Sequence, residues 1–274
     1  MKKALSLLLA AFIIVPCFFT AVLAEEDEEV FSGTCGEYLT WTFDPETSEL
    51  SIEGTGEMSD SFTYQDNSEE DGIRVTSPWR FFTDMIKTVK ISEGVTTVGN
   101  CAFVKCSALE SISVPDSVTV LKDMCFGQGE SLKFTVYGNA NYIGNESNPY
   151  LILFSSAADD VTSCEIHENT RFVYNYAFKD NALLESVTVP ENVLYIMDGA
   201  FTGCTKLKDI YYGGSKADWE YVPLSIEDYD IYENVQVHYA KGWTKLTIPI
   251  LIVLVCVTVV TAFIRYRKLR KNKA

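Results

Sequence analysis

Apolar positions recur with a period of 23 residues through the middle of the chain. Four segments align in this period, and in each one the first, fourth and sixth positions are small or large apolar residues separated by polar ones. The segments begin at Ile86, Leu109, Val161 and Leu184. Such alternation over a short run is typical of a strand with one buried face. Each segment therefore predicts a strand whose fourth and sixth side chains point inward.

A phenylalanine occupies position 18 of every segment and follows a small residue each time. The four pairs are Ala102–Phe103, Cys125–Phe126, Ala177–Phe178 and Ala200–Phe201. A bulky ring needs a small neighbour where consecutive coils stack, so these pairs are predicted to lie in the core. One repeat buries little apolar surface by itself, and stability needs about three or more stacked copies with polar caps. The pattern predicts a mainly β fold, a short solenoid over residues 86–212.

The segments on either side of the repeats are expected to close this solenoid. Residues 38–43 and 49–53 alternate with period two around a turn, which predicts a β-hairpin cap within 25–85. The acidic stretch 59–76 lacks an apolar period and is predicted to be a mobile loop. An insertion at 138–160 interrupts the repeats, and its apolar run 150–154 predicts a strand in a hairpin. Residues 213–245 are expected to form a C-terminal cap and a juxtamembrane segment.

Both chain ends carry membrane signals. Residues 1–24 combine Lys2 and Lys3 with an apolar run, the pattern of a secretory signal peptide and its helix. Residues 246–264 are 19 uncharged, mostly apolar residues, close to the roughly 20 that cross a bilayer as a helix. The tail 265–274 holds six basic residues, which marks that side as cytoplasmic. We therefore expect a single-pass protein of the plasma membrane, with an extracellular ectodomain and a cytoplasmic C-terminus.

The strand pattern L-x-x-L-x-L, the E/D-x-V segment after it (93–95, 116–118 and 191–193) and the Ala–Phe pairs occur together at the 23-residue spacing. With these features, and with flanks at 33–43 and 50–58, the chain resembles BspA-like leucine-rich repeat proteins of bacterial surfaces. The resemblance implies a leucine-rich repeat solenoid on a membrane-anchored bacterial protein, acting in adhesion or in host and cell-surface interaction.

The charge is distributed unevenly along the chain. All 38 acidic residues lie within 25–245, whereas eight of the 22 basic residues lie outside that range, and the net charge is −16. Binding to nucleic acid requires Lys and Arg against phosphate. A domain this acidic therefore excludes nucleic acid as a partner.

Six of the eight cysteines lie in the predicted ectodomain, which raises the question of disulfides. Cys106 and Cys204 share position 21, but more than two coils separate them, and a bridge needs Cα atoms within about 7 Å. Cys164 stands at an inward strand position and is expected to act as a small core residue. Cys101 and Cys125 are nearly in phase in adjacent copies, so this pair alone could form a bridge.

No catalytic constellation is evident. Cys164 and His167 are close in sequence, but alternation along a strand points them to opposite faces, so they cannot form a thiol–imidazole dyad. His238 lies in an alternating segment near the membrane. The chain has no phosphate-binding glycine loop, no nucleophile elbow and no zinc-type Cys/His spacing. We expect no enzymatic activity, no catalytic residue, no cofactor and no metal.

Recognition suits this architecture better, because the third, fifth and seventh strand positions line one open face of a leucine-rich repeat. The fifth position, the candidate binding row, is occupied by Lys90, Ser113, Glu165, Thr188 and Tyr211. The third position is occupied by Thr88, Ser111, Ser163, Ser186 and Asp209. A strip rich in hydroxyls can hydrogen-bond a glycan or an extended peptide, although Ser and Thr are also ordinary solvent-facing strand residues.

The function expected from the sequence is a cell-surface module that binds an extracellular protein or glycan. Two alternatives stay open: a structural envelope protein without a specific ligand, and a cell-wall hydrolase with an unrecognised site. The sequence gives no indication of the oligomeric state.

Overall fold

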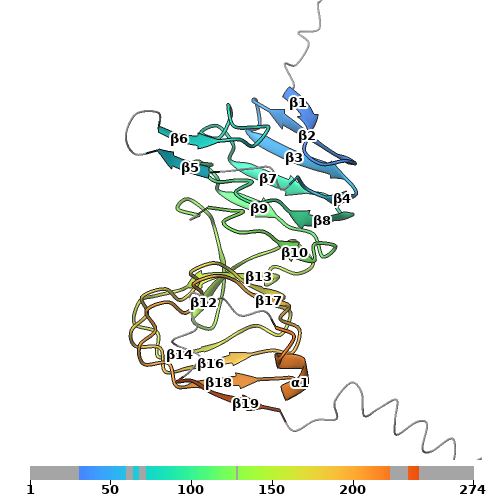
Figure 1. Cartoon of the computed structure of the whole chain (residues 1–274). Helices are drawn as coiled ribbons and strands as arrows, with labels where there is room; N and C mark the ends of the chain where they lie inside the picture. Colours follow the sequence, from blue (N-terminus) through green and yellow to red (C-terminus); the bar gives the residue numbers. More distant parts are fainter. Residues whose placement is uncertain (1–30, 60–63, 68–71, 128, 223–233, 241–274) are drawn as a thin grey trace, which may run out of the picture.

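The strands predicted from the 23-residue period form a first set of parallel strands, a ladder that is divided between two sheets. They are β7 (Thr88–Ile91), β9 (Ser111–Ser113), β14 (Ser163–Glu165), β16 (Ser186–Val189) and β18 (Asp209–Tyr212). Their fourth and sixth repeat positions are buried throughout, as are the position-18 phenylalanines, so the predicted repeat phase is confirmed. Within this ladder β7 pairs with β9, and β16 pairs with β14 and β18, all in parallel. The coils stack along one axis from β1 to β19 (Figure 1).

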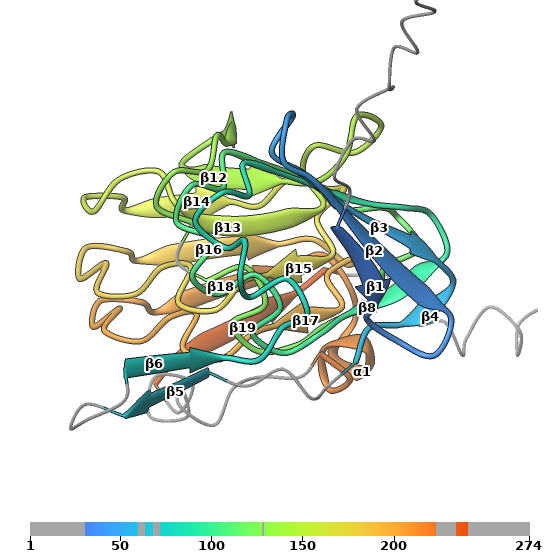
Figure 2. The same ribbon diagram turned by 90° about the horizontal axis from the view of Figure 1, so that it is seen from above.

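A second set of short strands follows the first strand of each coil. These strands are β4 (Gly56–Glu57), β8 (Val95–Val98), β10 (Val120–Leu121), β13 (Ile152–Ser156), β15 (Phe172–Val173) and β17 (Tyr195–Ile196). In one sheet β8 lies between β4 and β10, and in another β15 lies between β13 and β17. The coils that begin at β7, β9, β14 and β16 therefore each contribute one strand to either side of the core, whereas β13 belongs to the insertion. Figure 2 shows the same stack from above.

This computed structural model describes most of the chain between the predicted signal peptide and the predicted transmembrane helix. The described residues are 31–59, 64–67, 72–127, 129–222 and 234–240. Among them, no helix has both the length and the apolar character that a bilayer crossing requires. The predicted signal peptide, transmembrane helix and basic tail lie outside the described residues.

The predicted N-terminal hairpin is confirmed, and it does more than cover the first coil. Strand β2 (Leu39–Asp44) pairs antiparallel with β1 (Phe31–Thr34) and with β3 (Glu49–Gly54). The far side of β3 pairs in parallel with β7, with Leu50 opposite Val89 and Ser51 opposite Lys90. The parallel ladder therefore begins inside the segment expected to be only a cap.

The C-terminal cap also continues the ladder. Strand β19 (Gln236–Tyr239) pairs in parallel with β18. Between them lies the short helix α1 (Lys216–Trp219), which begins at a capping box formed by Ser215 and Asp218. Trp219 is buried and its ring lies 4.9 Å from that of Tyr212, so α1 closes the apolar interior at this end.

The expectation of a structureless loop over 59–76 is wrong. Strands β5 (Tyr64–Asn67) and β6 (Gly72–Val75) pair antiparallel as a separate hairpin. Ile73 and Val75 are β-branched, and such residues favour strands even in a segment that is acidic overall. The hairpin lengthens the coil between β3 and β7, which is why self-comparison at a fixed period does not reveal that coil.

Stacked aromatic rings run through the core from coil to coil. Trp79 stacks on Phe103 at 5.3 Å between ring centroids, and Phe103 stacks on Phe126 at 6.1 Å. Beyond the insertion, Phe178 stacks on Phe201 at 5.5 Å with ring planes 6° apart. The small residue before each phenylalanine is buried as well, in agreement with the sequence prediction.

The residue at position 16 of each repeat adopts a left-handed backbone conformation, which the residue types at this position do not predict. Cys101, Met124, Tyr176 and Gly199 all have φ between 49° and 68°. Only the last of them is the glycine that this region favours. A Cβ at Gly199 would also lie 2.2 Å from the Tyr176 ring. The turn is therefore imposed by coil stacking rather than by local preference.

The insertion at 138–160 forms the expected hairpin, since β12 (Ala140–Ile143) pairs antiparallel with β13, and β11 (Thr135–Tyr137) pairs with the other side of β12. It also interrupts coil stacking between β9 and β14. Elsewhere the position-18 N–H bonds to a carbonyl of the next coil, as from Phe103 to Cys125 at 2.7 Å. At the interruption, the Phe126 N–H instead donates to the Tyr174 hydroxyl at 2.8 Å.

A neighbouring amide is satisfied in the same way. The Met124 N–H donates to the Asn175 side-chain oxygen at 3.3 Å, whereas the equivalent Cys101 N–H bonds to the Asp123 carbonyl. Asn175 is held in turn by Asp123, to whose carboxylate it donates at 2.7 Å. Two side chains therefore replace the backbone acceptors that the interrupted stack cannot supply.

Replacing Phe201 by Ala removes a fully buried ring from the stack and leaves a cavity. We expect the free energy of unfolding to fall by about 3–5 kcal/mol, measured by denaturant titration. Phe81→Ala is the matched control, because Phe81 is 74% exposed and its loss is expected to cost less than about 0.5 kcal/mol. Equal effects of the two substitutions would show that the ring is not part of the core.

Replacing Tyr174 by Phe keeps the ring and removes only the hydroxyl. The buried Phe126 N–H then loses its acceptor, so we expect a loss of about 1–3 kcal/mol of stability. Tyr195→Phe serves as control, since that side chain is partly exposed and lies at the sheet edge. An unchanged denaturation midpoint for Tyr174→Phe would mean that another acceptor satisfies this amide.

Candidate functional site

The five residues of the candidate binding row lie in two separate sheets. Lys90 and Ser113 are cross-strand neighbours in the N-terminal sheet, on β7 and β9. Glu165, Thr188 and Tyr211 are cross-strand neighbours in the C-terminal sheet, on β14, β16 and β18. Ser113 does not face β14, because it forms an isolated parallel bridge with Gly144 of the insertion. The insertion thus divides the predicted single row into two.

Each row is longer by one residue than the repeat phase suggests. In the N-terminal sheet Ser51 lies opposite Lys90, and in the C-terminal sheet His238 lies opposite Tyr211. The sequence signal for these positions was the period-two alternation of the two caps, which does not by itself reveal pairing with the repeats. The C-terminal row therefore consists of Glu165, Thr188, Tyr211 and His238.

Tyr211 and His238 form a stacked pair at the end of this row. Their ring centroids are 4.7 Å apart and the planes differ by 15°. The separation matches the roughly 4.8 Å between adjacent strands, so the parallel register places ring upon ring. His238 Nε2 lies 2.7 Å from Asp209 Oδ1, and this hydrogen bond fixes the imidazole. Tyr211 remains 45% exposed.

The N-terminal row has a different chemical character. Lys90 Nζ lies 2.7 Å from a carboxylate oxygen of Glu49 on the neighbouring strand. The ion pair is solvent-exposed and contributes little to stability, but it offsets the one positive charge of the row. Ser51 and Ser113 are only partly exposed. This row presents no aromatic side chain.

A second aromatic cluster lies where the insertion meets the C-terminal half. His167 stacks on Tyr150 at 3.7 Å between centroids and meets Tyr137 edge-on at 4.7 Å. The His167 backbone N–H donates to the Tyr142 hydroxyl, and His167 Nδ1 accepts the Asn169 N–H at 3.1 Å. Both histidines of the chain therefore pack against tyrosine rings.

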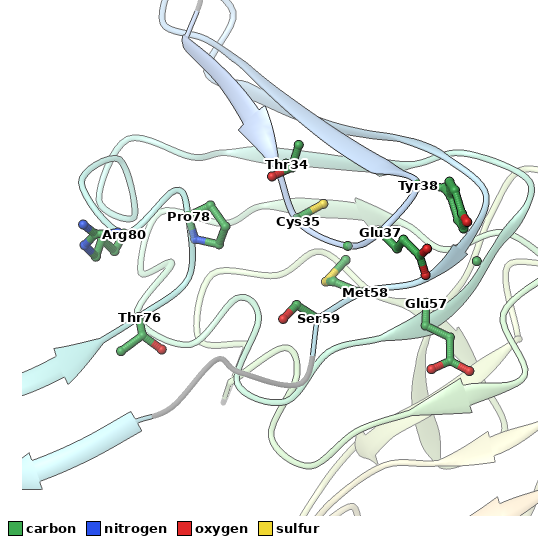
Figure 3. Close-up of a pocket in the computed structure, with 12 residues that line it drawn as sticks. Thr34, Cys35, Glu37, Tyr38, Glu57, Met58, Ser59, Thr76, Pro78 and Arg80 are labelled. Atoms are coloured by element: carbon green, nitrogen blue, oxygen red, sulfur yellow. The ribbon is translucent and has the colours of Figure 1, made fainter.

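An open hollow of about 880 Å³ lies at the N-terminal end of the solenoid, between the turn after β1 and the segment before Trp79 (Figure 3). Glu37, Tyr38 and Glu57 line one side and Arg80 lies on the other, with Met58 between them (Figure 3). Glu37, Tyr38, Glu57 and Met58 lie in the flanks that contribute to the family resemblance, but no sequence pattern predicted a hollow there. The hollow is broad and open to the surface rather than a cleft that could enclose a substrate.

Comparison with known families identifies the repeats. Six copies of the BspA type leucine rich repeat region match residues 72–150 and 152–220, more than half of the chain. The chain belongs to the BspA-type leucine-rich repeat family. The resemblance inferred from the strand pattern and the Ala–Phe pairs is thereby confirmed. A search of curated proteins finds no match.

Solved structures with detectable similarity are bacterial leucine-rich repeat proteins. A leucine rich cell surface protein from Faecalibacterium prausnitzii is 25% identical, over 60% of this chain and 41% of its own, with a TM-score of 0.29. The leucine rich repeat protein of T. pallidum is 19% identical, over 76% of this chain and 99% of its own, with a TM-score of 0.31. A leucine-rich repeat protein from Eubacterium ventriosum is 17% identical, over 67% and 72%, with a TM-score of 0.25. These TM-scores are low, so the family assignment rests on the repeat match.

The thiols of this BspA-type solenoid are structural. All six cysteines of the described residues are buried, and Cys125 is a free thiol, so the bridge considered for Cys101 and Cys125 is not formed. Burial raises the pKa of the Cys164 thiol to about 12, which keeps it protonated and unreactive at neutral pH. Cys164 is thus the core residue that its repeat position predicted. Among the described residues, no group of three or more His, Cys, Asp or Glu side chains could hold a metal ion.

The buried thiols predict a loss of stability at alkaline pH. Burial raises the pKa of Cys35, Cys106 and Cys164 to about 12 from an ordinary value of about 9. Between these values the unfolded chain releases thiol protons that the folded chain keeps, so unfolding becomes easier as pH rises. Below pH 9 the full contribution is present.

Each such thiol is expected to lower stability by up to about 1.4 kcal/mol per pH unit in this window. Cys164→Val introduces the side chain found at this position in two other repeats and should keep the packing. The variant should lose the contribution of one thiol to the pH dependence of the free energy of unfolding. The free energy of unfolding is measured by denaturant titration at pH 8 and pH 10. An identical slope in the variant would contradict the assignment to Cys164.

Proposed function

We propose that this BspA-type protein is a cell-surface interaction module that binds an extracellular protein or glycan through the face of its C-terminal sheet. One observation carries the proposal. Glu165, Thr188 and Tyr211 are exposed cross-strand neighbours, and the register continues to His238, so four side chains form an unbroken row on a rigid ladder. Side chains held by regular strands lose little freedom on binding, which favours recognition.

Binding, rather than catalysis, is the activity that this arrangement supports. His238 donates to Asp209 and stacks on Tyr211, and His167 is likewise occupied by Asn169 and its neighbouring tyrosines. Cys164, the thiol closest to His167 in sequence, lies in the core with its pKa raised by burial. Neither histidine is thereby placed beside an activated nucleophile.

Attachment to the plasma membrane is part of the proposal and rests on the sequence. A signal peptide at 1–24, a membrane-spanning helix at 246–264 and a basic tail at 265–274 would hold the solenoid outside the cell by a single pass. The acidic solenoid excludes nucleic acid as a partner. A leucine-rich repeat platform of this kind would then face proteins or glycans of the surroundings.

The test is a binding screen with the full-length chain in detergent against extracellular matrix proteins, glycans and isolated cell envelopes. The variant Glu165→Ala/Thr188→Ala/Tyr211→Ala should weaken saturable binding about tenfold or more, because it removes the exposed side chains of the row. The control Ser51→Ala/Lys90→Ala/Ser113→Ala changes the same repeat positions in the N-terminal sheet and should leave affinity within about twofold.

Equal loss in both triple variants, or binding that neither affects, would reject the C-terminal face as the site. Absence of binding to every class by a folded chain would favour a structural role in the envelope instead.

A further inference from the structure

The side-chain sizes in the C-terminal row imply a notch above its smallest member, Thr188. Thr188 on β16 lies between Glu165 on β14 and Tyr211 on β18, all at the same repeat position. Adjacent strands are about 4.8 Å apart, so the two flanking residues are separated by roughly 10 Å at the backbone. A threonine is much shorter than either neighbour. The space above it is therefore bounded by a carboxylate on one side and an aromatic ring on the other.

The open face of Tyr211 is directed into this notch. Its ring is nearly parallel to that of His238, at a separation close to the strand spacing, so the stack runs along the ladder. Because β18 lies between β16 and β19, His238 covers the ring face on the β19 side and the opposite face is turned toward Thr188. The hydrogen bond from His238 to Asp209 keeps this pair in place before any ligand arrives.

We propose that a neutral saccharide binds in this notch, with one sugar ring stacked on Tyr211 above Thr188 and with its hydroxyls bonded to Glu165. The inference rests on the proposed function and names its ligand class. The π-face of tyrosine carries partial negative charge, and the C–H groups on one face of a sugar ring carry partial positive charge. The Glu165 carboxylate accepts hydrogen bonds, and the Thr188 hydroxyl both donates and accepts.

Charge favours a neutral ligand. Glu165 and Asp209 are the acidic residues of the fifth- and third-position rows in the C-terminal sheet, and the chain as a whole carries a formal charge of −16. A sugar acid would meet repulsion from these carboxylates, whereas uncharged hydroxyls would meet acceptors. The surface is thus complementary to a ligand that is rich in hydrogen-bond donors and bears no negative charge.

A saccharide fits this face better than a protein does. Strands β16 and β18 have ladder partners on both sides, so their backbone groups are not available to an added peptide strand. Tyr211 is the one large apolar side chain among the eight residues of the two rows, and the others are Ser163, Glu165, Ser186, Thr188, Asp209, Gln236 and His238. Protein interfaces concentrate their energy in clusters of buried aromatic and Arg anchors, which these two rows do not provide.

The experiment is calorimetric titration of the full-length chain, in a detergent without a sugar headgroup, with neutral hexasaccharides built from glucose, galactose, mannose or N-acetylglucosamine. A hexamer of a uronic acid serves as the charged comparison. At least one neutral hexamer should bind saturably and the uronic acid hexamer should not. Tyr211→Ala should raise the Kd about tenfold or more, and Tyr211→Phe, which keeps the ring, should stay within about threefold.

Thr188→Trp fills the notch and should abolish binding, whereas Lys90→Trp places the same side chain at the same repeat position of the N-terminal sheet and should not. Thermal unfolding of each variant shows whether the solenoid is intact, and Glu165→Gln gives a second, nearly isosteric probe of the same notch. Equal loss in Thr188→Trp and Lys90→Trp, or preferred binding of the uronic acid, would overturn the assignment.

The outcome also separates this inference from the proposed function. If no neutral hexamer binds while an extracellular protein does, and Glu165→Ala/Thr188→Ala/Tyr211→Ala weakens that protein's binding, the saccharide assignment fails and the interaction face stands. If the full-length chain binds nothing in either experiment, both proposals fail together.

Discussion

Contact between equivalent positions of neighbouring coils is the interaction on which the whole molecule depends. No coil has an interior of its own, so inward strand residues and position-18 rings are buried against a neighbouring coil, as in the stacked pairs Phe103–Phe126 and Phe178–Phe201. That requirement is strong enough to impose left-handed backbone at position 16 in residues as unsuited to it as Tyr176 and Met124. Stability in such a solenoid is a sum of neighbour contacts, and any break in the register must be compensated locally.

The insertion is such a break, and the way the structure compensates for it determines which residues are neighbours on the outer face. Tyr174 and Asn175 supply the acceptors that the next coil would otherwise provide, so the Phe126 and Met124 amides stay satisfied at the interruption between the two core clusters. The outer face has no comparable bridge. Ser113 pairs with the insertion instead of with β14, and the row that faces solvent is divided. The candidate site consequently belongs to the C-terminal sheet, where three parallel pairings align four side chains.

Period and side-chain size predicted the buried half of the structure because burial depends on repeat phase alone. Cys164 illustrates this, since its place at an inward strand position identified it as a core residue without any knowledge of its partners. The segment that forms the β5–β6 hairpin was predicted to be a loop. Strands β3 and β19 were assigned to the caps, without pairing to the repeats. Their pairings join segments that are not separated by 23 residues, so comparison of the sequence with itself at that period does not detect them.

The sequence by itself determined the coil, its inward positions and the family, because a 23-residue register that buries apolar side chains has one consistent solution. It also placed Tyr211 on the outer face. Tertiary structure alone decided which outer residues meet. His238 reaches Tyr211 only because β19 returns beside β18, and Ser113 is separated from Glu165 because it pairs with Gly144 of the insertion instead. Solvent-facing positions carry no burial constraint, so their neighbours follow from strand order rather than from pattern.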